Sequence, residues 1–204
     1  MARWMPGTAE RLQAAALELF AARGYEQTTA TEIAQAVGLT ERTFFRHFSD
    51  KREVLFSGQQ SLIDAFLAGL DSAPDDATPI ESAVRALMSS ASFFDDERRA
   101  WSRKRQSIID DNPALQEREA LKLAGIGRTL AAELRVRGAD GVAAEVAAQI
   151  AMMAFGIAFT QWIAEDEKRS FAEVVMAVLR DVRSVAGDLD TVGADGIEPP
   201  TAGV

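Results

Sequence analysis

Residues 28–55, TTATEIAQAVGLTERTFFRHFSDKREVL, constrain the fold of this 204-residue chain more than any other stretch. Their first part carries apolar residues at helical spacing, namely Ile33, Ala34 and Val37. Gly38 follows them, and glycine accepts the left-handed conformation that a helix end often needs. Thr40 is suited to cap a second helix, because its hydroxyl can accept a free backbone N–H. Two short helices joined by a tight turn are typical of a helix-turn-helix that reads DNA.

The second helix of this motif has two different faces. With 3.6 residues per turn, Phe44 and Phe48 share the inner face, and Arg42 and Arg46 lie near the centre of the outer one. The residues that flank the two arginines are Thr43 and Phe45. An arginine can bond O6 and N7 of guanine through two donors, and an aromatic edge can contact a thymine methyl. We therefore expect this outer face to enter the major groove.

Polar residues around the motif are suited to the DNA backbone. Asp50 can cap the following helix, which would place Lys51 in its first turn, and we expect Thr31 to cap the first helix of the motif. Helix N-termini and Lys or Thr side chains bind phosphates. His47, the only histidine, is expected either to bond a phosphate or to be buried. One histidine and no cysteine give no metal-ligand set, and no metal or cofactor is expected.

Three spaced patterns, within residues 15–25, 28–39 and 43–55, occur together here. With them, the chain resembles the TetR family of bacterial transcriptional regulators over residues 9–56, and beyond residue 60 it resembles the family only in architecture. The resemblance implies a three-helix DNA-binding head and a larger helical body that dimerises and binds a small molecule. The DNA contacts that it implies are Thr31, Arg42, Thr43, Phe45, His47 and Lys51. Arg46 is added by its place on the outer face of the helix.

One departure from the family pattern concerns Phe44 and Phe45, where the family often has tyrosine. Phe45 has no hydroxyl, so it cannot bond a phosphate and any contact that it makes with DNA must be apolar.

The rest of the chain predicts an all-α fold of about nine helices. Helical spacing or helix-start signals predict helices over 8–23, 51–70, 80–91, 98–109, 112–136, 142–165 and 170–185. Residues 72–79 form a polar linker with two prolines. We expect a DNA-binding domain at 1–56, a ligand-binding and dimerisation domain at 57–187, and a disordered tail at 188–204, which has four acids and no bases.

The charge of the chain is unevenly distributed. Residues 1–58 hold seven basic and seven acidic residues, and the remainder holds 15 basic and 24 acidic, which gives the net −9. An acidic body would disfavour DNA binding outside the head. No P-loop, G-x-G-x-x-G or H-E-x-x-H motif occurs, so an enzyme is not expected. The most apolar stretch, 143–164, contains Glu145, Gln149 and Gln161, which favours a buried dimer helix over a membrane span. A cytoplasmic protein is expected.

The basic run 98–105, RRAWSRKR, allows three interpretations. A charged run on a helix is usually a solvated face, here with one buried tryptophan. Interleaved basic and aromatic residues could also form a second nucleic-acid patch. The resemblance to the family adds a role in coupling the body to the head.

A small apolar or amphipathic effector is expected in the body, because the family resemblance implies a cavity there. The candidate lining residues are Trp101, Gln149, Met152, Phe155 and Phe159. Most aromatic and methionine residues at helical spacing are ordinary core.

A two-fold homodimer is expected from the last two helices, since two apolar stripes exceed what one chain of this size would bury. The candidate interface residues are Ile150, Met153, Ile157, Val174, Val175, Val178, Leu179 and Val182. Symmetry then requires an inverted-repeat operator. The expected function is a repressor that its effector releases from this operator. The alternatives are a helical protein-interaction module and a constitutive DNA binder without an effector.

Overall fold

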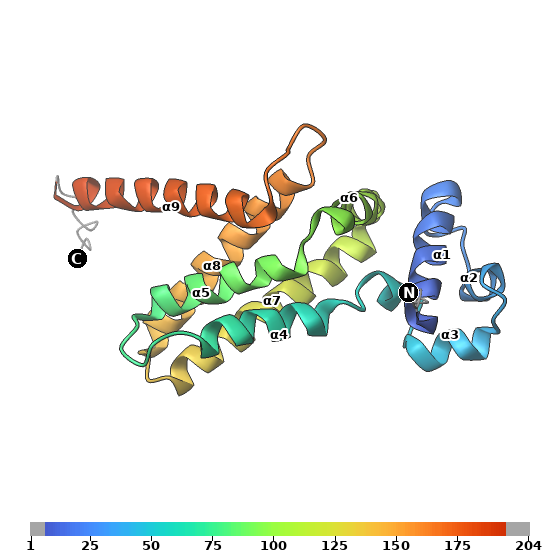
Figure 1. Cartoon of the computed structure of the whole chain (residues 1–204), viewed down its shortest axis with the longest axis horizontal. Helices are drawn as coiled ribbons and strands as arrows, with labels where there is room; N and C mark the ends of the chain where they lie inside the picture. Colours follow the sequence, from blue (N-terminus) through green and yellow to red (C-terminus); the bar gives the residue numbers. More distant parts are fainter. Residues whose placement is uncertain (1–6, 195–204) are drawn as a thin grey trace, which may run out of the picture.

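The computed structural model describes residues 7–194 and the side chains of residues 7–188. Within that range the fold is all-α, with nine α-helices and two short 3-10 helices, as the sequence predicts (Figure 1). The elements are α1 (Thr8–Arg23), α2 (Ala30–Ala36), α3 (Glu41–His47), η1 (Arg52–Leu55), α4 (Gln59–Asp71), α5 (Pro79–Ser90), η2 (Ala91–Phe93), α6 (Asp96–Asp110), α7 (Pro113–Val136), α8 (Gly141–Trp162) and α9 (Phe171–Ala194).

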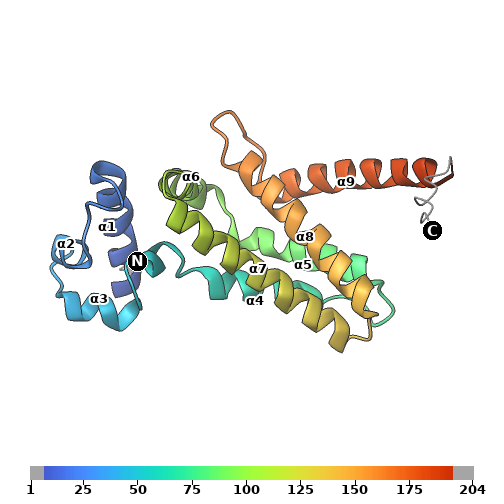
Figure 2. The same cartoon turned by 180° about the vertical axis from the view of Figure 1, so that it is seen from behind.

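The molecule is elongated. The three helices α1, α2 and α3 form a head at one end, and α4, α5, α7 and α8 lie side by side in the body (Figures 1 and 2). The helix α6 lies between the two parts. Beyond the body, the C-terminal part of α9 projects away from the other helices in both views.

Capping residues fix the helices of the head. Thr40 caps α3 as predicted, because its hydroxyl accepts the N–H of Thr43 at 3.3 Å. Gly38 has a φ of 72°, which gives the left-handed turn predicted between α2 and α3. The predicted cap of α2 is wrong: Thr29, not Thr31, occupies the N-cap and forms a capping box with Glu32. The glutamate three residues after Thr29 favours that position, because it can bond back to the N-cap N–H.

Two predicted boundaries are corrected by the structure. The predicted helix over 51–70 is interrupted, because η1 ends at Leu55 and α4 begins only at Gln59. The predicted tail does not begin at residue 188, because α9 continues to Ala194. The rest of that tail, residues 195–204, lies outside the described residues.

The core of the head includes residues from the body side of the predicted domain boundary at residue 56. Ile108 and Ile109 of α6 and Leu115 of α7 are buried in the same cluster as Phe20 and Phe44. The head therefore packs on the corner between α6 and α7. The boundary between head and body in space does not coincide with the predicted boundary at residue 56, because parts of α6 and α7 belong to the core of the head.

In the body, α4 and α5 approach closely at Gly69. A Cβ at this position would lie 2.5 Å from the carbonyl oxygen of Arg85 and 2.5 Å from Cβ of Ser89. Glycine is therefore needed for this contact, which brings Phe66 and Leu70 into the body core.

Candidate nucleic-acid interface

The outer face of α3 is the candidate reading surface. Phe44 and Phe48 are buried, as predicted, and hold α3 against the head core. On the opposite side the aromatic ring of Phe45 is 48% exposed. Arg42 and Arg46 are exposed there, and neither makes a hydrogen bond or an ion pair with residues 7–188. Two unpaired guanidinium groups beside an exposed ring suit base edges in a major groove.

The other predicted contact residues of the motif lie near this face. Thr31 is half-buried, and its hydroxyl donates to Oε2 of Glu41 at 2.8 Å, which ties α2 to the first turn of α3. The Thr43 hydroxyl lies 3.1 Å from that of Thr40. His47 is exposed, so of its two expected roles the buried one is wrong.

Lys51 is half-buried and is held by the head itself. Its Nζ donates to the carbonyl oxygen of Tyr25 at 2.8 Å and lies 4.0 Å from the centre of the Tyr25 ring. Burial raises the pKa of the Tyr25 hydroxyl to about 12, so the partner of the ammonium is a neutral ring. The Asp50 side chain makes the expected contacts, since its Oδ1 accepts the N–H groups of Arg52 and Glu53. The N-cap position of η1 is Lys51, however, so Lys51 precedes the first turn and does not lie in it as predicted.

The basic run of α6 is only partly a solvated face, since Arg98 is exposed and the other four basic side chains are half-buried. Arg103 donates through Nε to the carbonyl of Ile163 at 2.6 Å and through Nη2 to that of Ala164 at 2.9 Å, at the C-terminal end of α8. Positive groups at a helix C-terminus satisfy its free carbonyls. Arg99 donates to the carbonyls of Glu167 and Arg169, which lie in the connection between α8 and α9. Lys104 of the same run donates to Oε2 of Glu18 of α1 at 2.6 Å, so the run contacts both the body and the head. This favours the coupling role over a second nucleic-acid patch.

The structure separates the predicted effector residues. Trp101 packs against the head core, and Gln149 is exposed and bonds Glu145 on the outside of α8. Only Met152, Phe155 and Phe159 lie in or against the body core. The prediction that Trp101 and Gln149 line one site with the other three residues is therefore wrong. Helical spacing does not specify which neighbouring core a side chain joins.

An aromatic cluster occupies the body between α8, α9 and η2. Its members are Phe94, Phe155, Phe159, Trp162 and Phe171, and ring centres within it lie 4.5 to 6.3 Å apart. Trp162 is fully buried, and its indole N–H has no hydrogen-bond partner among the described residues. A buried donor without an acceptor is costly and uncommon. Sequence reasoning did not single out Trp162 for the effector site, although its indole is the polar group inside this cluster.

Two hollows on the described part of the chain lie outside the aromatic cluster. One, of about 660 Å³, is an open cleft between α1 and α6 that is lined by residues such as Tyr25, Ala100 and Lys104. The other lies beside the start of α5. Because the rings of the cluster contact one another, a ligand among them would have to displace packed side chains.

The structure divides the predicted dimer residues into two groups. Val174, Val175 and Val178 are wrong as interface residues, because the chain's own core buries them to 2% exposure or less. Ile150, Leu179 and Val182 are half-buried. Met153 and Ile157 remain 48% and 43% exposed on one face of α8.

By length and composition α8 is the one described helix that could cross a membrane, but core helices pass the same test, and α8 packs on α5, α7 and α9.

Two family models match the chain. Residues 12–57 match the model described as bacterial regulatory proteins, tetR family, and residues 78–187 match that of the MftR C-terminal domain. The chain is 30% identical over 174 residues to the protein named mycofactocin biosynthesis transcriptional regulator MftR of Mycobacterium tuberculosis, covering 83% of this chain and 86% of that protein. It is also 44% identical over 84 residues to the HTH-type transcriptional regulator TcmR of Streptomyces glaucescens, which is 40% of this chain and 37% of that relative.

Solved structures show the same fold. The SmeT–triclosan complex has a TM-score of 0.57 at 20% identity and covers 85% of this chain and 90% of SmeT. The regulator FadR of Bacillus subtilis, in complex with stearoyl-CoA, has a TM-score of 0.56 at 20% identity, with 83% and 95% covered. With a helix-turn-helix head, a helical body and matches that span both parts, this chain belongs to the TetR family of bacterial transcriptional regulators.

Proposed function

We propose that the chain is a dimeric regulator that reads an inverted-repeat DNA operator with the outer face of α3. The observation that carries this proposal is that Arg42 and Arg46 are exposed without an ion-pair partner in residues 7–188 and lie beside the exposed ring of Phe45. Guanine edges would satisfy the two guanidinium groups, and Phe45 would contact a thymine methyl. The acidic remainder of the chain would keep DNA away from other surfaces. A bacterial regulator that binds DNA would act in the cytoplasm.

A mobility-shift assay with DNA from upstream of the protein's own gene tests this function. Binding to one inverted repeat, retained over unrelated DNA at about 0.15 M salt, is expected for a specific regulator. Binding that does not distinguish this DNA from random sequence, or no binding at all, would instead support an all-helical interaction module.

We further propose that a small apolar molecule with a hydrogen-bond acceptor binds at the aromatic cluster and releases the operator. Two structural relatives are complexes with triclosan and stearoyl-CoA. The unpartnered N–H of Trp162 supports a ligand that carries an acceptor. Such a ligand would open the cluster, and it would lower operator affinity only if it bound more tightly to the conformation whose heads do not fit the two half-sites.

Trp162 fluorescence tests the effector site. Binding of an apolar acid or ester at the cluster should change the emission of the wild type and should not change it in Trp162→Phe. A second candidate, a constitutive DNA binder, is favoured by the close packing of the same cluster. It would be supported if no such compound changed either the fluorescence or the operator affinity.

A further inference from the structure

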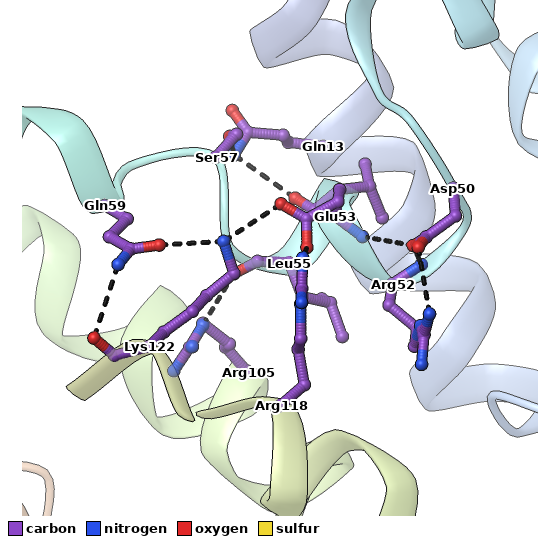
Figure 3. Close-up of polar contacts among 11 residues, drawn as sticks. Gln13, Asp50, Arg52, Glu53, Leu55, Ser57, Gln59, Arg105, Arg118 and Lys122 are labelled. Carbon is purple, nitrogen blue, oxygen red and sulfur yellow. Dashed lines mark hydrogen bonds and ion pairs between the residues drawn. The ribbon is translucent and has the colours of Figure 1, made fainter. Parts of the chain in front are cut away.

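A group of polar contacts joins the head to α7, outside the helix-turn-helix motif. Glu53 of η1 lies at its centre (Figure 3). Its Oε1 accepts from Nε and Nη2 of Arg118 at 2.8 and 2.6 Å, and its Oε2 accepts from Nζ of Lys122 at 3.0 Å. Arg118 and Lys122 are four residues apart on α7 and therefore share one face of the helix. We call these three side chains the Glu53 clamp.

Further polar contacts surround the clamp. Nζ of Lys122 also donates to Oε1 of Gln59 at 2.7 Å, so the same lysine joins η1 to the start of α4. Arg105 of α6 donates through Nε to the carbonyl of Leu55 at 2.8 Å and through Nη1 to Glu119 of α7 at 2.8 Å. Burial lowers the pKa of Arg105, and the charge of Glu119 opposes this shift.

The clamp is more protected from water than a typical surface ion pair. The side chains of Glu53 and Lys122 are each 17% exposed, and that of Arg118 is 35% exposed. Water and salt screen partly buried charges less than exposed ones. With the apolar contacts of Ile108 and Ile109, these ion pairs fix the head on the corner between α6 and α7.

From the clamp, α7 continues into the body core as one helix of 24 residues, about 36 Å long at 1.5 Å per residue. Its distal residues Ile126, Leu130 and Leu134 are buried in the body cluster that also holds Phe155. By contrast, residues 56–58 interrupt the path from η1 into α4. A continuous helix can transmit a tilt between its ends, whereas the interrupted path can bend at the break.

We infer that the Glu53 clamp sets the orientation of the DNA-binding head relative to α7 and the body core that α7 enters. The inference rests on the proposed function, because head orientation matters when two heads must meet two half-sites. Glu53, Arg118 and Lys122 act as positioning residues on the side of the head that packs on α7.

A distance measurement within one chain tests the clamp without DNA. The natural sequence has no cysteine, so the exposed Gln35 of α2 and Arg128 of α7 can be replaced by cysteine and spin-labelled. Diluting labelled chains into an excess of unlabelled protein restricts the signal to distances within a chain. The clamp variants are Glu53→Gln and the double variant Arg118→Met/Lys122→Met. The control is Arg135→Met, which removes a 3.0 Å ion pair with Glu145 at the other end of α7.

The wild type and the control should give one narrow distance, and both clamp variants a broader distribution with an unchanged thermal unfolding midpoint of the body. If Glu53→Gln does not fold, the double variant Arg118→Met/Lys122→Met provides the test. Its Glu53 carboxylate can still be hydrated after its two partners are removed. Equally narrow distributions in folded clamp variants would overturn the inference.

Operator binding supplies the second readout. The clamp variants should lose about 2- to 30-fold in affinity for the matched operator, and they should discriminate less against an operator with one base pair inserted between the half-sites. A broadened distance distribution with unchanged affinity and unchanged spacing discrimination would contradict the inference. If the wild type bound no DNA, the proposed function would fail, and the distance measurement would still report on the clamp.

Discussion

At the scale of single residues, Arg46 is the most direct test of the reading surface. Arg46→Ala should cost about 1–3 kcal/mol in operator binding and relax the preference at one base position, since one bidentate contact to a base would be lost. Binding to a panel of operators with single base changes measures both effects. The matched control is Arg23→Ala, because Arg23 is an exposed arginine of the head that pairs with Glu32 away from α3. Equal affinity of Arg42→Ala/Arg46→Ala and wild type, with an intact fold, would contradict the assignment.

Lys51 allows two residue-scale roles that one variant separates. In Lys51→Met the contact with the Tyr25 carbonyl is lost, so the thermal unfolding midpoint of the head should fall. If Lys51 also leaves Tyr25 to bind a phosphate, the slope of log affinity against log salt should shrink by about 1. A lower midpoint with an unchanged slope would show that Lys51 is structural only.

At the scale of elements, the capping box of α2 makes the head sensitive to acid. The N–H and then the hydroxyl of Thr29 bond the Glu32 carboxylate and lower its pKa below the usual 4.5. A carboxyl whose pKa is lower in the folded state stabilises the fold above its unfolded-state pKa, and this contribution is lost as the pH falls through the folded-state value.

The unfolding midpoint of the wild type should therefore fall more steeply than that of Glu32→Gln as the pH is lowered from about 5 to about 3. Glutamine can still accept the Thr29 bonds but does not titrate. Glu26→Gln is the control, because the exposed Glu26 accepts no hydrogen bond within residues 7–188. Parallel pH curves for wild type and Glu32→Gln would argue against a stabilising role for the charged cap.

At the scale of the whole molecule, the exposed apolar side chains of α8 and the projecting end of α9 are the features that a second copy would cover. Met153 and Ile157 lie four residues apart, and Val146 is exposed one heptad before Met153. Val185 of α9 is 66% exposed, and the C-terminal part of this helix projects away from the other described helices (Figure 2). Isolated helices are marginal in water, so a partner helix would stabilise this end.

Met153→Glu/Ile157→Glu should thus convert a dimer into a folded monomer and abolish tight operator binding, because one head alone reads one half-site. Light scattering at micromolar concentration and circular dichroism measure the two effects. The control Leu121→Glu changes an exposed leucine of α7 and should leave the dimer intact. Val178→Glu would bury a charge in the body core and unfold the chain, so it does not test the interface. A monomeric wild type would contradict this prediction.

The sequence by itself determined the features that depend on neighbours within a few residues. The turn at Gly38, the cap at Thr40 and the opposite faces of Phe44 and Arg46 follow from backbone freedom and helical periodicity, and the structure has them as predicted. Helix α1 spans the residues 8–23 that its apolar spacing predicts, and α7 begins at Pro113 and ends at Val136 as expected.

Only the tertiary structure decided which partners distant residues meet. Val178 has the spacing of an interface residue, yet α9 lies so that the chain's own core covers it. Arg103 belongs to a run that is usually solvated, yet it reaches the end of α8, 60 residues away. Glu53 stands at a position that the motif leaves unspecified, and its role depends on Arg118, 65 residues further on. Helical periodicity specifies the face of a helix that a residue occupies, whereas the packing of the helices specifies what that face contacts.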